Sequence, residues 1–115
     1  MKELTVDNLK VKIFDTRSQM GIAAAKTISE KISALLEKQE YINIVFAAAP
    51  SQNEFLDSLS KSNVAWARIN AFHMDEYVGL DEKAPQLFGN YLKNKLFGKV
   101  NFREVHYIKG ITKDS

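Results

Sequence analysis

Strand-like and helix-like segments alternate along this chain, and that alternation is the feature that most limits how it can fold. Short apolar or alternating runs are typical of strands, whereas apolar residues that recur at every third or fourth position are typical of helices. The predicted strands are residues 9–14, 42–48, 66–72 and 105–108, and the predicted helices begin near Met20, Ser51 and Leu87. The pattern predicts an α/β fold with a mainly parallel sheet, right-handed crossovers and helices on its faces.

The boundaries of these segments follow from a few residues. Residues 42–48 are nearly all apolar and rich in β-branched side chains, which predicts a central strand covered on both faces. Ser51 and Glu54 have the spacing of a capping box, which predicts that the next helix begins at Ser51, and Gly98 is the predicted C-cap of the last helix. No helix is predicted after residues 105–108. We therefore expect residues 1–115 to be a single α/β domain whose sheet is incomplete at its C-terminal edge.

The composition excludes several classes of partner and site. With 16 basic and 14 acidic residues the net charge is +2, which is too weak to indicate nucleic acid or an anionic membrane as a partner. No apolar run approaches the roughly 18 residues of a membrane span. The chain has no cysteine, so disulfides and thiolate sites are excluded and a cytoplasmic location is expected.

Two loops follow predicted strands, where ligands of open parallel sheets bind. The first loop runs from Ala47 to Asn53, and its small side chains and the following helix N-terminus predict a phosphate site. In the alternative interpretation Ser51 only caps its own helix, and Glu54 in the first turn repels an anion. No glycine-rich nucleotide-binding motif is present.

The second loop holds the adjacent acids Asp75 and Glu76, flanked by His73 and Tyr77. Two neighbouring carboxyl groups in a partly dry loop predict that one has a raised pKa suited to proton transfer. The alternative is a solvated acidic turn in which Asp75 caps local backbone N–H groups. The histidines, His73 and His106, lack metal-ligand spacing, so neither a metal nor another cofactor is predicted and His106 receives no role.

A longer string around this loop resembles a known family. Phe72-His73-Met74-Asp75-Glu76-Tyr77-Val78-Gly79-Leu80, followed by Pro85 and an aromatic helix, resembles the glucosamine-6-phosphate deaminase/isomerase family, which is related to the 6-phosphogluconolactonases. The resemblance implies a Rossmann-like αβα sandwich of the NagB/RpiA/CoA transferase-like kind. It also implies an enzyme that converts an aminosugar 6-phosphate into a ketose phosphate and ammonia.

The resemblance also implies roles for individual residues. Asp75 is similar in position to the family's general base, which moves a proton between C2 and C1 of the ring-opened sugar, and Glu76 completes a catalytic acidic pair. The implied substrate and phosphate contacts are Pro50, Ser51, Gln52, Asn53 and Tyr77. The deaminases usually carry a Gly-Gly-Thr or Gly-Gly-Ser turn where this chain has Ser51-Gln52-Asn53. The family's second-half motif, with its histidine and acids, is absent, so we expect the chain to correspond to an N-terminal half that is inactive by itself.

The predicted function is therefore aldose-ketose isomerisation and deamination of a hexosamine 6-phosphate, either glucosamine 6-phosphate or galactosamine 6-phosphate. Two alternatives remain open, a non-catalytic regulatory module that binds a sugar phosphate and a 6-phosphogluconolactonase-like hydrolase. The expected partners are a small-molecule sugar phosphate and further copies of the chain, because an open sheet edge favours self-association. Nucleic acid and membranes are not expected partners.

Overall fold

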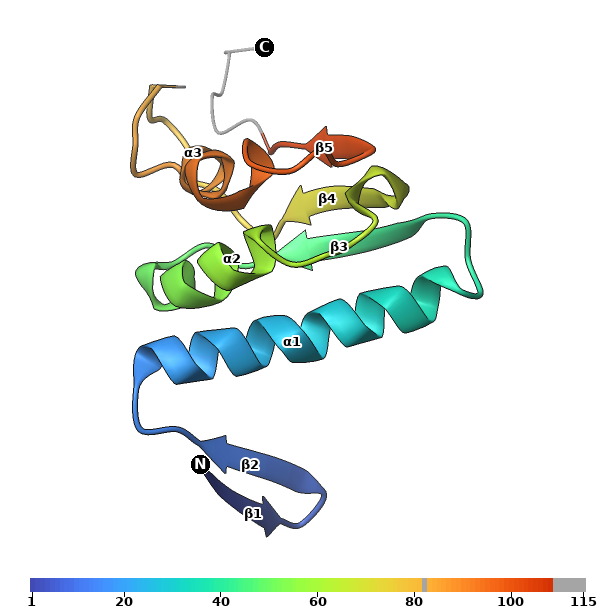
Figure 1. Cartoon of the computed structure of the whole chain (residues 1–115). Helices are drawn as coiled ribbons and strands as arrows, with labels where there is room; N and C mark the ends of the chain where they lie inside the picture. The colour runs from blue at the N-terminus through green and yellow to red at the C-terminus, as the bar shows by residue number, and fades with distance from the viewer. Residues whose placement is uncertain (82, 109–115) are drawn as a thin grey trace.

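The computed structural model describes residues 1–81 and 83–108 (Figure 1). Within these residues the helices and strands follow one another in the order β1 Lys2–Val6, β2 Leu9–Ile13, α1 Arg17–Leu36, β3 Ile42–Phe46, α2 Asn53–Ser60, β4 Ile69–His73, α3 Phe88–Leu92 and β5 Glu104–His106. Short helical turns occupy Pro50–Gln52, Trp66–Arg68 and Lys93–Phe97. The expected alternation of strands and helices is present from α1 onward, and the fold is α/β.

The larger sheet has three parallel strands in the order β3-β4-β5. Ile42 of β3 pairs with Ile69 of β4, and Ala71 of β4 pairs with Val105 of β5. The prediction that residues 42–48 form the central strand is wrong within the described residues, because β4 lies in the middle and β3 pairs only with β4.

The described helices lie on one face of this sheet. α1, α2 and α3 contribute Ala25, Leu56 and Leu92 to a buried cluster with Phe46 and Ala71. Side chains alternate between the faces of a strand, so the face formed by the other residues of β3 is uncovered, and Val45 is 63% exposed. The β-branched run predicted a strand covered on both faces, but such a run fits equally a strand with one face left open.

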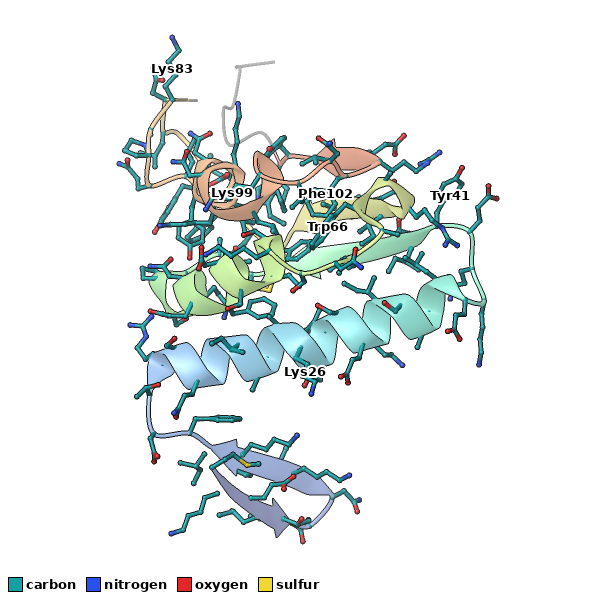
Figure 2. All side chains as sticks on the ribbon, viewed as in Figure 1. Lys26, Tyr41, Trp66, Lys83, Lys99 and Phe102 are labelled. Atoms are coloured by element: carbon teal, nitrogen blue, oxygen red, sulfur yellow. The ribbon has the colours of Figure 1, made fainter. Side chains whose placement is uncertain are left out.

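Aromatic rings fill the space between the helices and the sheet. The rings of Trp66 and Phe102, both labelled in Figure 2, have centroids 5.2 Å apart. Phe97 lies 5.6 Å from both Phe46 and Phe102 in edge-to-face geometry. Such pairs prefer edge-to-face packing over face-to-face packing, and here they join the π-helical turn Lys93–Phe97 to the sheet.

The first strand has a different partner from the one that the alternation predicts. Leu9–Ile13 is a strand as expected, but it pairs antiparallel with Lys2–Val6 and not with the parallel sheet. Asp7 between them has a positive φ of 53°, which suits a two-residue hairpin turn. Figure 1 shows this hairpin on the far side of α1 from the sheet. β1 was not among the predicted strands.

The helix predictions are mostly confirmed, with one correction at the start of α2. α1 begins at Arg17, where the Thr16 hydroxyl accepts a hydrogen bond from the Gln19 N–H at 3.1 Å. The capping box is wrong, because α2 begins at Asn53 without a side-chain cap, and the Glu54 carboxylate pairs with Arg17 at 2.9 Å. The predicted last helix is present as α3 and the π-helical turn, and the Gly98 N–H donates to the Lys93 carbonyl at 2.8 Å.

The third and fourth predicted strands are shorter than expected. The strand predicted over 66–72 begins at Ile69, because Trp66–Arg68 form a 3-10 turn. The Arg68 guanidinium donates to the carbonyls of Leu36, Gln39 and Glu40 at 2.7–2.8 Å, so this turn closes the end of α1. The strand predicted over 105–108 is Glu104–His106. Among residues 1–81 and 83–108, no helix is both long enough and apolar enough to cross a membrane.

Candidate functional site

The two predicted loops leave the same edge of the sheet. Phe46 at the end of β3 pairs with His73 at the end of β4, and the Met74 N–H donates to the Phe46 carbonyl at 3.1 Å. The phosphate-loop candidate follows β3 and the acidic loop follows β4. The structure therefore brings the two loops to the carboxyl ends of neighbouring parallel strands, where open α/β sheets bind ligands.

Asp75 has an exposed side chain in the acidic loop. Within the described residues its carboxylate has no hydrogen-bond or ion-pair partner. The alternative interpretation, in which Asp75 caps local backbone N–H groups, is therefore not observed in this part of the chain. The carboxylate is available to a ligand that approaches the end of β4.

Glu76 lies beside Asp75, but its carboxylate is fully engaged. It accepts hydrogen bonds from the backbone N–H groups of Phe88 at 2.7 Å, Gly89 at 2.8 Å and Tyr77 at 3.0 Å. Phe88 and Gly89 are the first residues of α3, so the carboxylate caps this short helix from 12 residues upstream. A carboxylate at a helix N-terminus is stabilised by the free N–H groups there.

The pKa of Glu76 is lowered, although a raised pKa was expected for one acid of the pair. Burial removes water from the carboxylate and by itself raises the pKa. The hydrogen bonds from Gly89, Tyr77 and Phe88, together with His73, outweigh burial and lower the pKa of Glu76 below its ordinary value. A raised pKa was predicted for one acid of the pair, and Glu76 is not that acid. Its contacts are those of a carboxylate that stays ionised and holds α3.

Gly89 leaves room for this arrangement. A Cβ atom at residue 89 would lie 3.0 Å from Cδ1 of Tyr107, 3.1 Å from Oε2 of Glu76 and 3.5 Å from Nε2 of His73. The first two distances are shorter than ordinary van der Waals contacts. The absence of a side chain at residue 89 lets the Glu76 carboxylate and the Tyr107 ring approach the start of α3 together.

His73 joins three segments at the site. The side chain is 4% exposed. Its Nδ1 lies 2.8 Å from the Asp75 carbonyl oxygen, and its Nε2 accepts a hydrogen bond from the Ile108 N–H at 2.8 Å. The ring also lies against Tyr107, with centroids 6.0 Å apart. His73 therefore connects the end of β4, the acidic loop and the segment after β5.

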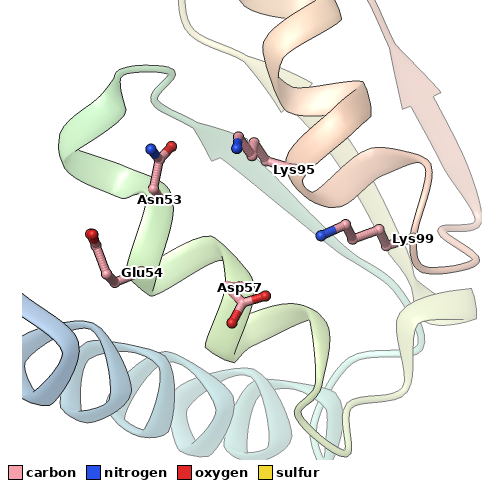
Figure 3. A pocket seen from close by; sticks show the side chains of 5 residues that line it. All are labelled: Asn53, Glu54, Asp57, Lys95 and Lys99. Carbon is pink, nitrogen blue, oxygen red and sulfur yellow. The ribbon is translucent and has the colours of Figure 1, made fainter.

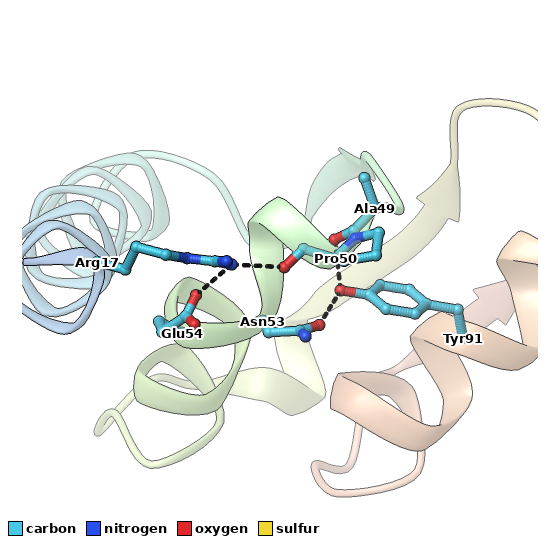
Figure 4. A network of polar contacts seen from close by, with 6 residues as sticks. All are labelled: Arg17, Ala49, Pro50, Asn53, Glu54 and Tyr91. Carbon is cyan, nitrogen blue, oxygen red and sulfur yellow. Dashed lines mark hydrogen bonds and ion pairs between the residues drawn. The ribbon is translucent and has the colours of Figure 1, made fainter.

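Tyr91 connects α3 to the phosphate-loop candidate (Figure 4). Its hydroxyl oxygen lies 2.6 Å from the Ala49 carbonyl oxygen and 2.5 Å from the side chain of Asn53. Both neighbours are acceptors, the Ala49 carbonyl and Oδ1 of Asn53, and the single hydroxyl proton donates to one of them at a time. Burial raises the pKa of Tyr91, which keeps this hydroxyl protonated.

α3 therefore touches both loops. The Glu76 carboxylate of the acidic loop holds its first turn, and Tyr91 near its end holds the turn that contains Ala49 and Asn53. The role of Tyr91 could not be predicted from the sequence, because nothing in an amphipathic helical pattern distinguishes an apolar ring from one whose hydroxyl bonds a distant loop.

Arg17 is the second residue whose role could not be predicted from the sequence. Its guanidinium donates to the Pro50 carbonyl and to the Glu54 carboxylate, both at 2.9 Å (Figure 4). Arg17 lies 33 residues before Pro50, so no local pattern points to it. It places a positive charge beside the phosphate-loop candidate, and the Glu54 carboxylate offsets part of that charge.

The other predicted phosphate-loop residues form a 3-10 turn, Pro50–Gln52. The Gln52 N–H donates to the Ala49 carbonyl and the Asn53 N–H to the Pro50 carbonyl, so these two donors are occupied. Ser51 is exposed and its hydroxyl remains available. Tyr77 in the acidic loop lies against Phe88, with ring centroids 4.8 Å apart.

A separate hollow lies between α2 and the π-helical turn (Figure 3). Its volume is about 270 Å³, and it is lined by Asn53, Glu54, Asp57, Lys95 and Lys99. The acids lie on α2 and the lysines on the opposite wall, so the two walls carry opposite charges. No group of three potential metal ligands occurs among the described residues.

Comparisons with known proteins agree with this architecture. No family model matches the chain. A curated glucosamine-6-phosphate deaminase from Clostridium acetobutylicum is 24% identical over 110 residues, which are 92% of this chain and 45% of that protein. One from Streptococcus pneumoniae is 26% identical over 103 residues, which are 90% of this chain and 42% of that protein.

Solved structures give the same result for the fold. A monomeric glucosamine-6-phosphate deaminase of the NagB superfamily superimposes with a TM-score of 0.74 at 19% identity, over 88% of this chain and 43% of that one. The 6-phosphogluconolactonase of Thermotoga maritima also reaches 0.74, at 22% identity, over 85% of this chain and 44% of that one. The predicted resemblance and fold class are confirmed, and the curated relatives are enzymes. The chain spans somewhat under half the length of these relatives.

Proposed function

We propose that this chain is part of a sugar-phosphate enzyme that isomerises and deaminates a hexosamine 6-phosphate, releasing a ketose phosphate and ammonia. The single observation that supports it most is the position of Asp75. Its carboxylate, exposed and without a partner among the described residues, follows β4 in a loop whose neighbours, His73 and Glu76, are fixed by hydrogen bonds. The curated relatives named glucosamine-6-phosphate deaminase supply the reaction class.

In this proposal Asp75 is the general base. Its carboxylate removes the proton from C2 of the ring-opened aminosugar and returns it to C1, and the nitrogen at C2 then leaves as ammonia after water adds. A general base must reach the proton that it abstracts within hydrogen-bond distance. The Asp75 carboxylate, which is exposed and has no partner in residues 1–81 and 83–108, meets that requirement, whereas the Glu76 carboxylate already accepts three N–H groups.

Glu76 therefore receives a positioning role in this proposal, in place of the catalytic role that the sequence suggested. Its negative charge lies on the first turn of α3, and α3 leads to Tyr91 and the turn after β3. The phosphate group of the substrate is assigned to that turn, where the Ser51 hydroxyl and the nearby Arg17 guanidinium are the available donors. Tyr77, which the resemblance gives as a substrate contact, lies in the acidic loop against Phe88.

A second candidate is hydrolysis of a phosphorylated sugar lactone. The similarity to the 6-phosphogluconolactonase of Thermotoga maritima, with a TM-score of 0.74, favours it as much as the deaminase structure favours the first candidate. The two reactions make different demands on Asp75. Isomerisation needs a base at C2, whereas lactone hydrolysis needs activation of water at C1.

A substrate comparison tests the proposal. Ammonia and ketose phosphate are measured with glucosamine 6-phosphate and galactosamine 6-phosphate, and acid release is measured with 6-phosphogluconolactone. The chain is assayed beside any longer product of the same gene. Ammonia release from either aminosugar supports the proposal, and hydrolysis of the lactone alone supports the second candidate. Binding without turnover of any substrate would overturn both and favour a regulatory module.

We also propose that the chain self-associates. The open edge of β3 and the exposed Val45 on the uncovered face leave backbone and apolar groups without a partner among the described residues. Such edges favour pairing between copies. Light scattering after size-exclusion chromatography should give a mass above 13.0 kDa, and a stable monomer would contradict this part of the proposal.

A further inference from the structure

His73 is the buried polar residue that the proposed chemistry leaves without a role. It is 4% exposed, and both ring nitrogens have a partner. The Ile108 backbone nitrogen can only donate, so Nε2 must present its lone pair. An imidazole with an unprotonated Nε2 carries its proton on Nδ1. The Nδ1–H then donates to the Asp75 carbonyl oxygen at 2.8 Å.

We infer that His73, as the neutral tautomer protonated at Nδ1, is a positioning residue that fixes the backbone of Asp75. This inference rests on the proposed function for the role of Asp75. The hydrogen bond to the Asp75 carbonyl sets where the backbone leaves β4, and so sets the direction in which the Asp75 side chain leaves the sheet. The Ile108 N–H selects the tautomer from the opposite side of the ring.

The surroundings of the ring support a single orientation. Tyr107 lies against one side of His73, with centroids 6.0 Å apart. The start of α3 is also near this ring, because a Cβ built on Gly89 would lie 3.5 Å from Nε2. With both nitrogens engaged, the ring cannot exchange tautomers without losing both hydrogen bonds in a buried position.

Two substitutions separate the two hydrogen bonds. The amide nitrogen of asparagine lies near the position of Nδ1, so His73→Asn keeps a donor for the Asp75 carbonyl and loses the contact to Ile108. The terminal atoms of glutamine reach the position of Nε2, so His73→Gln keeps an acceptor for the Ile108 N–H and loses the donor for Asp75. If His73 had only a structural role, the effect of each substitution would follow the stability of that variant and would not depend on which hydrogen bond it keeps.

The first test needs no enzyme activity. Long-range ¹H–¹⁵N spectra of the labelled chain at pH 8 should show a protonated Nδ1 and an unprotonated Nε2 for His73. The exposed His106 provides the comparison in the same spectrum. Amide hydrogen exchange of Met74 to Tyr77 should speed up in His73→Gln and stay near wild type in His73→Asn. A proton on Nε2, or equal exchange in the two variants, would overturn the inference.

The second test uses turnover. In the form of the protein that releases ammonia, His73→Gln should lower kcat on the order of 10-fold or more with little change in KM, because misplacing a catalytic group is costly. His73→Asn should keep most of kcat, and His106→Gln is the control. Equal losses in both His73 variants would refute the positioning role. Absence of turnover in the wild type would instead refute the proposed function, and the spectra would still decide the tautomer.

Discussion

The carboxylate of Glu76 lies 2.8 Å from the backbone nitrogen of Gly89 and holds the first turn of α3. Glycine at residue 89 permits this contact, because a Cβ there would lie 3.1 Å from the same carboxylate. The two residues are 13 positions apart in the sequence. Their contact ties the acidic loop after β4 to the helix that leads to the phosphate-loop candidate.

Replacing Glu76 should destabilise the fold more than replacing an exposed acid. Glu76→Gln keeps the shape of the side chain but removes the charge and turns one acceptor into a donor that faces an N–H group. We expect a loss of about 1–3 kcal/mol in the free energy of unfolding, measured by urea denaturation. Glu30→Gln on the exposed face of α1 is the matched control, and an equal effect of the two substitutions would contradict the assignment.

The contribution of Glu76 should depend on pH in a defined direction. Its pKa is lowered in the folded chain from an ordinary value of 4.5, so folding favours the ionised form. The stabilisation is complete above pH 4.5 and is lost as the pH falls below 4.5 through the folded pKa. The difference in unfolding free energy between wild type and Glu76→Gln should therefore shrink below that pH. If the difference instead grew as the pH fell, the lowered pKa of Glu76 in the folded chain would be contradicted.

A methyl group at residue 89 should disrupt the same contact from the other side. Gly89→Ala brings a Cβ to 3.0 Å from Tyr107 and 3.1 Å from Glu76, so one of them must move. Alanine favours helices by about 1 kcal/mol over glycine, but we expect overpacking to outweigh it and to destabilise the fold by about 1–3 kcal/mol. Asn94→Ala, an exposed site in the π-helical turn, is the control. Stabilisation by Gly89→Ala would contradict the packing described.

The Tyr91 hydroxyl should contribute to stability and to the position of the turn after β3. Tyr91→Phe keeps the ring and leaves the Ala49 carbonyl and the Asn53 side chain without their partner. We expect a loss of about 1–2 kcal/mol in unfolding free energy at an unchanged denaturant m-value. Tyr41→Phe removes a hydroxyl that makes no hydrogen bond among the described residues. Similar effects of both substitutions would contradict the role of Tyr91.

The elements that the sequence predicts well are those set by local patterns. α1 follows from its repeated apolar positions. β4 and the helix that ends at Gly98 follow from apolar runs and a C-cap glycine. Periodicity determines which residues face a core, so these segments could be located without knowledge of their partners.

The errors arise where a distant partner decides the outcome. Ser51 and Glu54 have the spacing of a capping box, but Arg17, 37 residues before Glu54, binds that carboxylate. Residues 9–14 have the alternation of a strand, but the pattern does not identify Lys2–Val6 as the partner. An apolar run such as 42–48 indicates burial without showing that one face of β3 stays uncovered.

In the candidate site, too, features set by local sequence could be predicted and features set by distant partners could not. The position of Asp75 and Glu76 at the end of a strand could be predicted from the sequence, and the structure brings them beside the turn after β3. Their different environments could not be predicted, because the N–H groups that bind Glu76 belong to residues 88 and 89. The contributions of His73 and Tyr91 likewise depend on contacts between distant segments.

The most direct measurement of the central claim compares Asp75→Asn with wild type in the form of the protein that turns over an aminosugar 6-phosphate. Asparagine keeps the shape of the side chain and cannot accept the C2 proton, so kcat should fall on the order of 10³-fold while sugar-phosphate binding changes little. Asp7→Asn in the hairpin turn, which removes the same charge far from the loop, should leave both unchanged. Ammonia release by Asp75→Asn at the wild-type rate would contradict the account.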